Sequence, residues 1–159
     1  MLLALLTTKY SHLIAEGWGA YEIGNFDRAE EHFREVLENE DDPQIGVLDV
    51  VEAHNGMGAV NLMHKDFFEA TRWYREAKYL LDQYYEGGRW PKRLDWFKKE
   101  DRPAMRALIG LAHLHYRSGA MEKAKELYTQ ILRADKHDGL GAKQFLEAIE
   151  ENKPFEQVG

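Results

Sequence analysis

Histidines and carboxylates are the residues of this chain that could do chemistry, and neither group has the spacing that such chemistry needs. There are seven histidines. His113 and His115 lie two positions apart, so on a helix their rings point in different directions. The HExxH pattern does not occur, and the other histidines have no ligand spacing to each other. We expect structural or surface roles for all seven.

Other signs of catalysis or metal binding are also missing. The chain has no cysteine, which excludes a disulfide scaffold, a thiolate metal site and a cysteine nucleophile. It has no GxxxxGK[ST] loop, GxSxG elbow or acidic calcium loop. The carboxylates at positions 38 and 40–42 are most simply a solvated loop, with stray cation binding as the alternative. We therefore predict no enzyme, no catalytic residue, no metal and no cofactor; a site of unfamiliar pattern is the alternative.

Composition indicates a folded, acidic protein. Hydrophobic residues make up 44% of the chain, which argues against disorder. The formal charge of −7 argues against nucleic-acid binding by the whole surface, so nucleic acid is an unlikely partner. The charge is uneven, because residues 1–53 hold three basic and twelve acidic residues. The lack of cysteine is compatible with a reducing compartment, and we expect a cytoplasmic protein.

The first residues contain a short apolar run, Leu2–Leu6. It has no basic residues before it and is too short for a signal peptide or a membrane span, so no membrane contact is expected. We expect it to form the first turns of a packed helix. The alternative is that this apolar end mediates self-association.

Three segments share one spacing of small and large residues. In each, a small residue is followed twelve positions later by an alanine and sixteen positions later by an aromatic residue. This spacing predicts three helical hairpins in which small residues let the first helix approach the second, while the aromatic residues fill the space between neighbouring hairpins. Such hairpins cannot bury their faces alone, so they must stack. The residues that define this frame are Gly17, Gly24, Ala29, Phe33 and Val36; Gly58, Ala70, Tyr74 and Ala77; and Ala112, Gly119, Ala124, Tyr128 and Ile131.

This frame resembles the tetratricopeptide repeat. The resemblance covers roughly two-thirds of the chain, although the alanines at 29, 70 and 124 are 41 and 54 residues apart instead of 34. It implies an all-α superhelix, or solenoid, of three hairpins, and a protein-interaction scaffold as the general function. We also expect a C-terminal capping helix over residues 138–152. The expected organisation is one domain over 1–152, with an insert at 85–103 between the second and third hairpins and a flexible tail at 153–159.

The first helices of stacked hairpins line a concave surface. We predict that this surface binds a peptide or helical segment of a partner protein. Aromatic residues would supply contact area, an amide would address the partner's backbone, and an arginine would hold a carboxylate. The candidate residues are Trp18, Tyr21, Asn55, Met63, His113, Tyr116 and Arg117.

Two alternatives to an open groove remain. In one, the protein is a self-assembling module, a homo-oligomer whose groove is filled by its own N-terminal stretch or by the insert. The insert mixes basic residues with Trp90 and Trp96, which could bind single-stranded nucleic acid or an acidic first hairpin of another copy. More simply, the tryptophans dock on neighbouring helices and the basic side chains stay in solvent. We expect a short helix at about 92–100 within this insert.

Overall fold

Helices form nearly all the regular structure of residues 8–158, the part of the chain that the computed structural model describes. Within these residues there are seven α-helices and no strand. The α-helices are α1 (Lys9–Glu22), α2 (Phe26–Glu38), α3 (Val47–Met63), α4 (Phe67–Tyr84), α5 (Arg102–Ser118), α6 (Met121–Ala134) and α7 (Ala142–Glu150). Three short 3-10 turns are η2 (Glu86–Gly88), η3 (Lys99–Asp101) and η4 (Phe155–Gln157).

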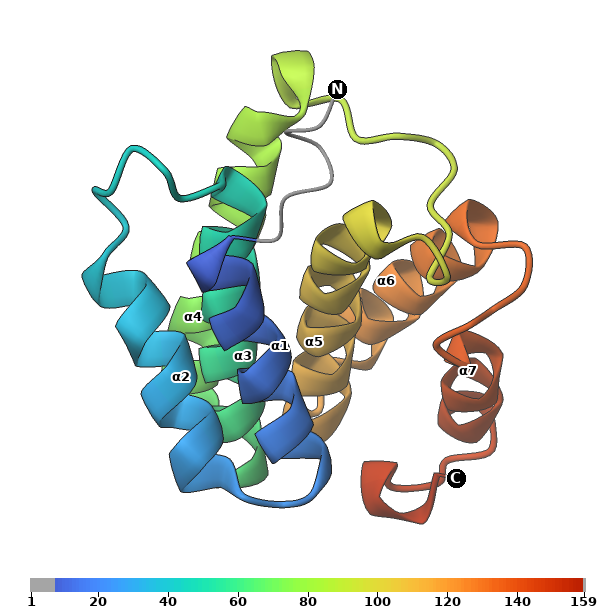
Figure 1. The fold of residues 1–159 in the computed structure, drawn as a ribbon. Coiled ribbons are helices and arrows are strands. Elements are labelled where there is room, and N and C mark those ends of the chain that lie inside the picture. Colours follow the sequence, from blue (N-terminus) through green and yellow to red (C-terminus); the bar gives the residue numbers. More distant parts are fainter. Residues whose placement is uncertain (1–7, 159) are drawn as a thin grey trace.

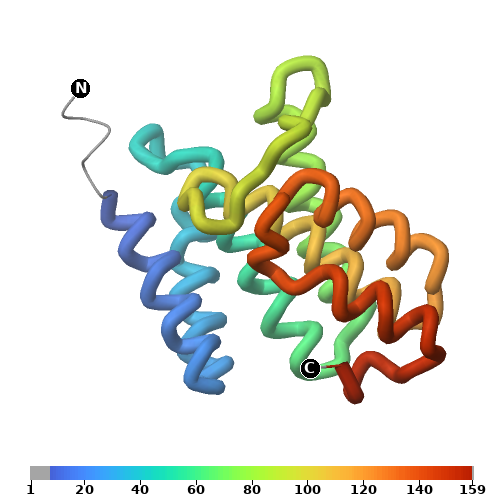
Figure 2. Tube along the Cα trace, turned by 90° about the vertical axis from the view of Figure 1, so that its right-hand side faces the viewer, coloured from blue at the N-terminus to red at the C-terminus, as the bar shows by residue number. Residues whose placement is uncertain are grey.

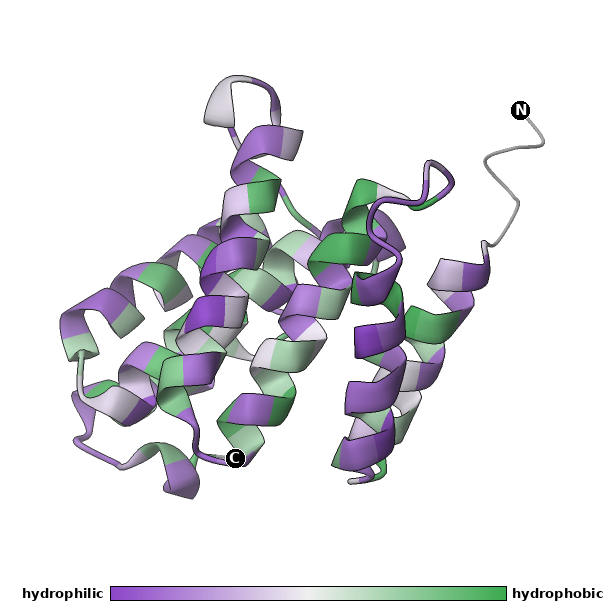
Figure 3. Ribbon diagram, turned by 90° about the vertical axis from the view of Figure 1, so that its left-hand side faces the viewer, coloured by the Kyte–Doolittle hydropathy of each residue, from purple (hydrophilic) through white to green (hydrophobic). Residues whose placement is uncertain are grey.

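The helices pair into three hairpins, α1–α2, α3–α4 and α5–α6 (Figure 1). The hairpins stack in order, because α3 packs on α1 and α2 as well as on α4 and α5. Helix α7 lies along α6 and covers the end of the stack (Figure 2). Hydrophobic and hydrophilic residues alternate in patches along the helices (Figure 3), as amphipathic packing requires. The predicted all-α solenoid of three hairpins with a capping helix is thus confirmed.

The turns inside the three hairpins share one conformation. Gly24, Lys65 and Gly119 occupy the same slot, with φ of +81°, +62° and +90°. Glycine adopts this left-handed conformation freely, whereas lysine does so at a cost of about 1 kcal/mol. In the first two turns the next residue, Asn25 or Asp66, caps the following helix by accepting a bond from the backbone N–H three residues on.

Aromatic rings wedged between glycines hold the hairpins together. Phe33 of α2 is fully buried between Gly17 of α1 and Gly56 of α3. A Cβ atom would lie 2.7 Å from the Phe33 ring at position 17 and 2.4 Å from it at position 56. Because Gly17 and Gly56 have no side chains, the Phe33 ring has room both inside its own hairpin and against the next one.

Tyr74 of α4 repeats the arrangement one hairpin further on. Its ring would meet a Cβ atom at 2.8 Å from Gly58 of α3 and at 2.2 Å from Gly110 of α5. The predicted frame identified the glycines at 17 and 58, which lie inside each hairpin. It missed the glycines at 56 and 110, which lie between hairpins.

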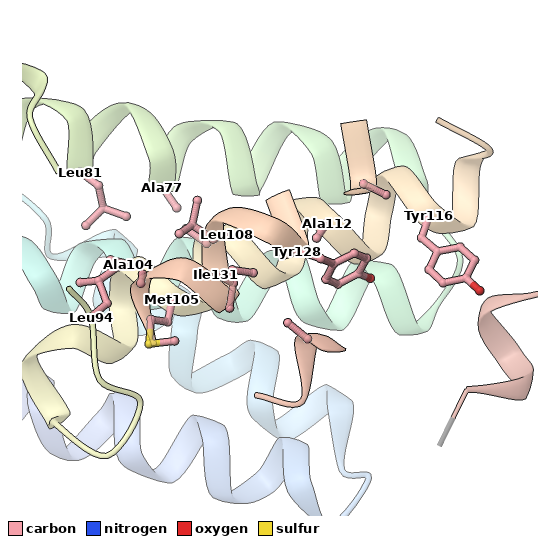
Figure 4. Packing of buried hydrophobic residues seen from close by; sticks show 14 of the residues in the cluster. Ala77, Leu81, Leu94, Ala104, Met105, Leu108, Ala112, Tyr116, Tyr128 and Ile131 are labelled. Carbon is pink, nitrogen blue, oxygen red and sulfur yellow. The ribbon is translucent and has the colours of Figure 1, made fainter. Parts of the chain in front are cut away.

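The third hairpin ends the series. Tyr128 of α6 is fully buried near Ala112 of α5 in the core (Figure 4). Its outer face does not meet a glycine. Phe145 of α7 stacks on it instead, with ring centroids 5.3 Å apart and planes 6° apart. Helix α7 thus takes the place that the first helix of a further hairpin would have.

The insert differs from the prediction. Residues 92–100 do not form a helix, and only the short turn η3 is present. The reason is that backbone donors are used across the fold: Leu94 N–H donates to Ala134 O (3.0 Å), and Asp95 N–H donates to the Asp101 carboxylate (3.0 Å). Leu94 itself is buried, so the chain runs extended over α6.

The apolar run Leu2–Leu6 lies outside the described residues. The capping helix is shorter than 138–152, because Gly141 takes a left-handed φ of +70° immediately before it. Residues 153–158, expected as a flexible tail, turn back and pack on α5 through Phe155.

Candidate partner-binding surface

A cleft of about 650 Å³ opens on the face formed by α1, α3 and α5, the first helices of the three hairpins. We call this the A-helix face. The end of the insert, η3, borders the cleft without filling it. The lining residues are Ser11, Ile14, Ala15, Trp18, Gly19 and Glu22 of α1; Leu48, Asp49 and Glu52 of α3; and Lys99, Glu100, Arg102, Pro103 and Arg106 of η3 and α5.

An aromatic and charged cluster forms the wall of the cleft. The guanidinium of Arg106 lies over the Trp18 ring, 4.2 Å from its centroid, and bonds to the Glu52 carboxylate. Trp18 also packs edge-on against Phe33, with centroids 5.1 Å apart. One cation thereby ties α1, α3 and α5 together. Trp18, predicted as a groove residue, lies in the cleft as expected.

Glu52 is the buried charge of this cluster. Burial raises the pKa of Glu52, and the nearby Arg106 guanidinium and Asn55 amide offset part of that rise. The Trp18 indole N–H also helps to lower it, yet Trp18 Nε1 is buried and makes no hydrogen bond of normal geometry. A buried donor without an acceptor is costly, so this site can gain from a further acceptor.

Asn55 is not available to a partner in this conformation. It is fully buried, and its Nδ2 donates to Pro103 O (2.9 Å) and Glu52 Oε1 (3.1 Å). The predicted chemistry, an amide addressing a backbone carbonyl, is present, but that carbonyl belongs to α5 of the same chain. Asn55 thus joins α3 to α5.

Tyr21, Met63 and Arg117 come from three helices near the opposite end of the A-helix face. Burial raises the pKa of Tyr21, and the charge of Arg117 partly offsets this rise, so the two side chains are near each other. Arg117 Nη1 donates to Leu62 O at the end of α3 (3.3 Å). Met63 is 48% exposed. These three residues remain candidates for partner contact.

His113 and Tyr116 lie beneath α7 and the segment that follows it. His113 Nδ1 is 2.6 Å from Tyr128 Oη, and the His113 ring lies 4.5 Å from that of Phe145. Burial and the nearby Arg117 charge lower the pKa of His113 to about 4, so the ring is neutral at neutral pH. Tyr116 is only 2% exposed. Tyr116 is closed off from solvent and His113 is only partly exposed, because the chain covers them with its own residues.

Several cleft residues were missed from sequence. Ala15 and Gly19 are exposed, one turn apart on α1, and their small size keeps the cleft open. Glu52 interrupts the apolar run of α3. A single carboxylate on such a helix could have identified it from sequence as a residue of interest. The position of Phe155 could not be predicted from sequence, because a single phenylalanine after a helix does not indicate where its ring packs.

The insert agrees with the simplest expectation, in which its tryptophans dock on the fold and its basic side chains stay in solvent. Trp90 packs on Tyr85 and donates to Asp82 (2.6 Å), and Trp96 packs on Gly139 and beneath Arg102. The basic side chains in between stay exposed.

Residues 8–158 contain no group of three or more histidine, cysteine, aspartate or glutamate side chains that could hold a metal ion. None of the helices in that range is long and apolar enough to cross a membrane.

Comparison with known proteins identifies the repeats. Residues 14–85, which include most of the first hairpin and all of the second, match the family described as tetratricopeptide repeat. No curated protein and no solved structure matches the chain. The third hairpin lies beyond the matched residues but shares their turn conformation and has a fully buried aromatic ring, Tyr128, at the corresponding position. Repeats of this kind generally mediate protein–protein interaction and are typically not catalytic. Residues 14–85 of this chain are therefore similar to the tetratricopeptide repeat family.

Proposed function

We propose that this protein binds an extended segment of a partner protein along the A-helix face, and that the open cleft beside Trp18 is the main contact. The observation that carries the proposal is the cleft itself, about 650 Å³ in volume and lined by the first helix of every hairpin. Small residues on α1 leave its floor accessible, and Trp18 with Arg106 forms a rigid wall.

The cleft offers mixed chemistry to a ligand. Trp18 and Leu48 supply apolar area, while Glu22, Asp49 and Lys99 place charges around it. These charged side chains can pair with the polar groups of an extended partner, and this favours a peptide over a purely apolar ligand.

A steric block tests the proposal. Ala15→Trp places a large side chain in the cleft from an exposed position, so it should not disturb the core. Glu16→Trp is the matched control, because it adds the same group on the same helix to an exposed residue outside the cleft. Proteins captured from a lysate by the unmodified chain and by Glu16→Trp, but lost with Ala15→Trp, are identified by mass spectrometry.

The strongest hit is then titrated as a purified protein. We expect at least tenfold weaker binding to Ala15→Trp than to the control. Equal binding to both variants would place the partner surface elsewhere on the molecule.

Self-assembly is the second candidate, and its support is narrower. The insert borders the cleft without occupying it, and Trp90 and Trp96 are packed on the fold. What remains is association through residues 1–8. Sedimentation with and without these residues measures this, and a monomer in both cases would rule it out.

A further inference from the structure

Residues 153–158 are directed onto the A-helix face by a specific helix end. At the end of α7, Lys153 N–H donates to Ala148 O (2.9 Å) and Asn152 N–H donates to Ile149 O (3.1 Å). Asn152 has a φ of +57°, the left-handed conformation of a Schellman motif. The motif reverses the chain, so the following residues run back toward α5.

The Phe155 ring enters a site made entirely of aromatic rings and one cation. It lies parallel to Phe145, with centroids 5.6 Å apart and planes 18° apart. His113 and Tyr116 of α5 meet it edge-on, at 5.0 and 5.5 Å. The Arg117 guanidinium lies over the ring, 5.2 Å from its centroid. We call these four side chains the aromatic seat.

Arg117 also selects the residue that follows. Its side chain is 10% exposed, and its Nε is 3.5 Å from the Glu156 carboxylate. This distance is too long for a normal hydrogen bond, and Arg117 Nε is buried without any other acceptor. A buried arginine donor without an acceptor is costly, so a better-placed carboxylate would be favoured here.

The contacts of residues 153–158 are those of a weakly held peptide. Tyr116 Oη donates to Lys153 O, which fixes the backbone. Phe155 is only partly buried, and the Glu156 side chain is 64% exposed. Ion pairs this exposed contribute little. The segment therefore depends on the Phe155 ring, the partly buried Val158 side chain, one backbone bond and its covalent tether.

We propose that the aromatic seat is a recognition site for a segment with an aromatic residue followed by an acidic one, and that residues 153–158 are its internal occupant, which a partner displaces. The inference rests on the proposed binding function of the A-helix face and adds the ligand chemistry. The ring site selects the aromatic residue, and Arg117 selects the acid. A basic residue after the aromatic one would face Arg117 with like charge and is rejected.

Peptide binding tests the inference directly. The probe is a fluorescein-labelled peptide with the sequence of residues 152–159, NKPFEQVG. It is titrated by fluorescence anisotropy into the unmodified chain and into Phe155→Ala/Glu156→Ala, whose own segment no longer competes. If the seat is free in at most a tenth of unmodified molecules, the double variant binds the peptide at least tenfold more tightly.

Matched controls make the result specific. A peptide with alanine in place of phenylalanine, and one with lysine in place of glutamate, should each bind at least tenfold more weakly. Adding Arg117→Gln to the double variant should remove the preference for glutamate over lysine. Circular dichroism verifies that each chain keeps its helical content. Glu156→Lys alone changes an exposed side chain, so it cannot unfold the protein, and it should give intermediate peptide binding.

Three results would overturn the inference. A folded double variant that does not bind the peptide saturably shows that the seat only anchors the chain. Equal binding of the substituted peptides shows that it does not read this pattern, and equal binding to the unmodified chain shows that residues 153–158 do not compete. The Ala15→Trp test is independent, because the cleft and the seat share no residue. Loss of partner capture with Ala15→Trp and no peptide binding would retain the proposed function and remove only the ligand assignment.

Discussion

Gly56 and Gly19 show at the residue scale how strongly position decides the effect of one methyl group. A Cβ atom at position 56 would lie 2.4 Å from the buried Phe33 ring, whereas at position 19 it would meet nothing within 4 Å. Gly56→Ala should therefore destabilise the protein by about 2 kcal/mol through overpacking. Gly19→Ala should stabilise it by about 0.5–1 kcal/mol, because glycine is a poor helix residue. Urea denaturation of both variants measures the two effects, and a shift of the same sign would contradict the wedge interpretation.

His113 gives the protein a predictable dependence on acid. Its pKa is lowered to about 4 by burial and by Arg117, so the folded state favours the neutral ring. The contribution is complete above the unfolded pKa of about 6.5 and is lost as pH falls from 6.5 toward 4, because the unfolded chain takes up the proton first. The loss should reach roughly 3 kcal/mol.

His113→Gln removes this titration and provides the control. The free energy of unfolding is measured by urea denaturation between pH 7 and 4 for both chains. We expect the unmodified chain to lose more stability than the variant across this range. Parallel curves would mean that the ring is not held neutral in the folded state.

At the scale of elements, comparison of the three hairpin turns shows where a substitution should increase stability. Helices α2 and α4 have side-chain caps, but Ala120 precedes α6 and provides none. Ala120→Asp should supply the missing acceptor and stabilise the protein by about 1 kcal/mol. Thermal unfolding followed by circular dichroism measures the gain, and Ala120→Leu, which adds size without an acceptor, should show none.

Lys65 is the exception among the left-handed turn residues. Its φ is +62°, where the other two hairpins have glycine. Lys65→Gly should stabilise the turn by about 0.5–1 kcal/mol, because the left-handed strain is removed at an exposed site. Chemical denaturation tests this, and a loss of stability would mean that the strain is already relieved.

The effects of changes to the capping helix belong to the whole molecule. In a stack where each hairpin contacts mainly its neighbours, a change at one end weakens the nearest hairpin most. Phe145→Ala removes the ring that covers Tyr128, and it should cost about 2 kcal/mol, since Phe145 is partly buried. Hydrogen exchange should show faster exchange in α5 and α6, with α1 and α2 almost unchanged. Uniform loss of protection would mean that the stack unfolds as a single unit.

The sequence predicted the hairpins well because their signals are local. Small residues and turn glycines act within a few positions, so the three hairpins form where the shared frame places them. The insert was harder, because Leu94 is held by α6, forty residues away in the chain. Local helix preference cannot anticipate that pairing.

The predicted groove residues divide in the same way. Trp18 was correctly placed on the A-helix face by helical periodicity. Asn55 and Tyr116 lie on the same side of their helices, but they are covered by α5 and by the segment after α7. Periodicity gives the direction of a side chain, not what another part of the chain places over it. Variants at Tyr116 would therefore report on stability before they report on binding.

The stacked rings of Tyr128 and Phe145 also limit the addition of further hairpins to the stack. A stack of hairpins in which each aromatic ring packs against glycines could be extended without limit by adding further copies. At the α7 end of the stack, Phe145 already covers Tyr128. The first helix of another molecule therefore has no open site against which to pack. The same contact that completes the core thereby discourages open-ended fibres, and it does so without any charged or polar barrier.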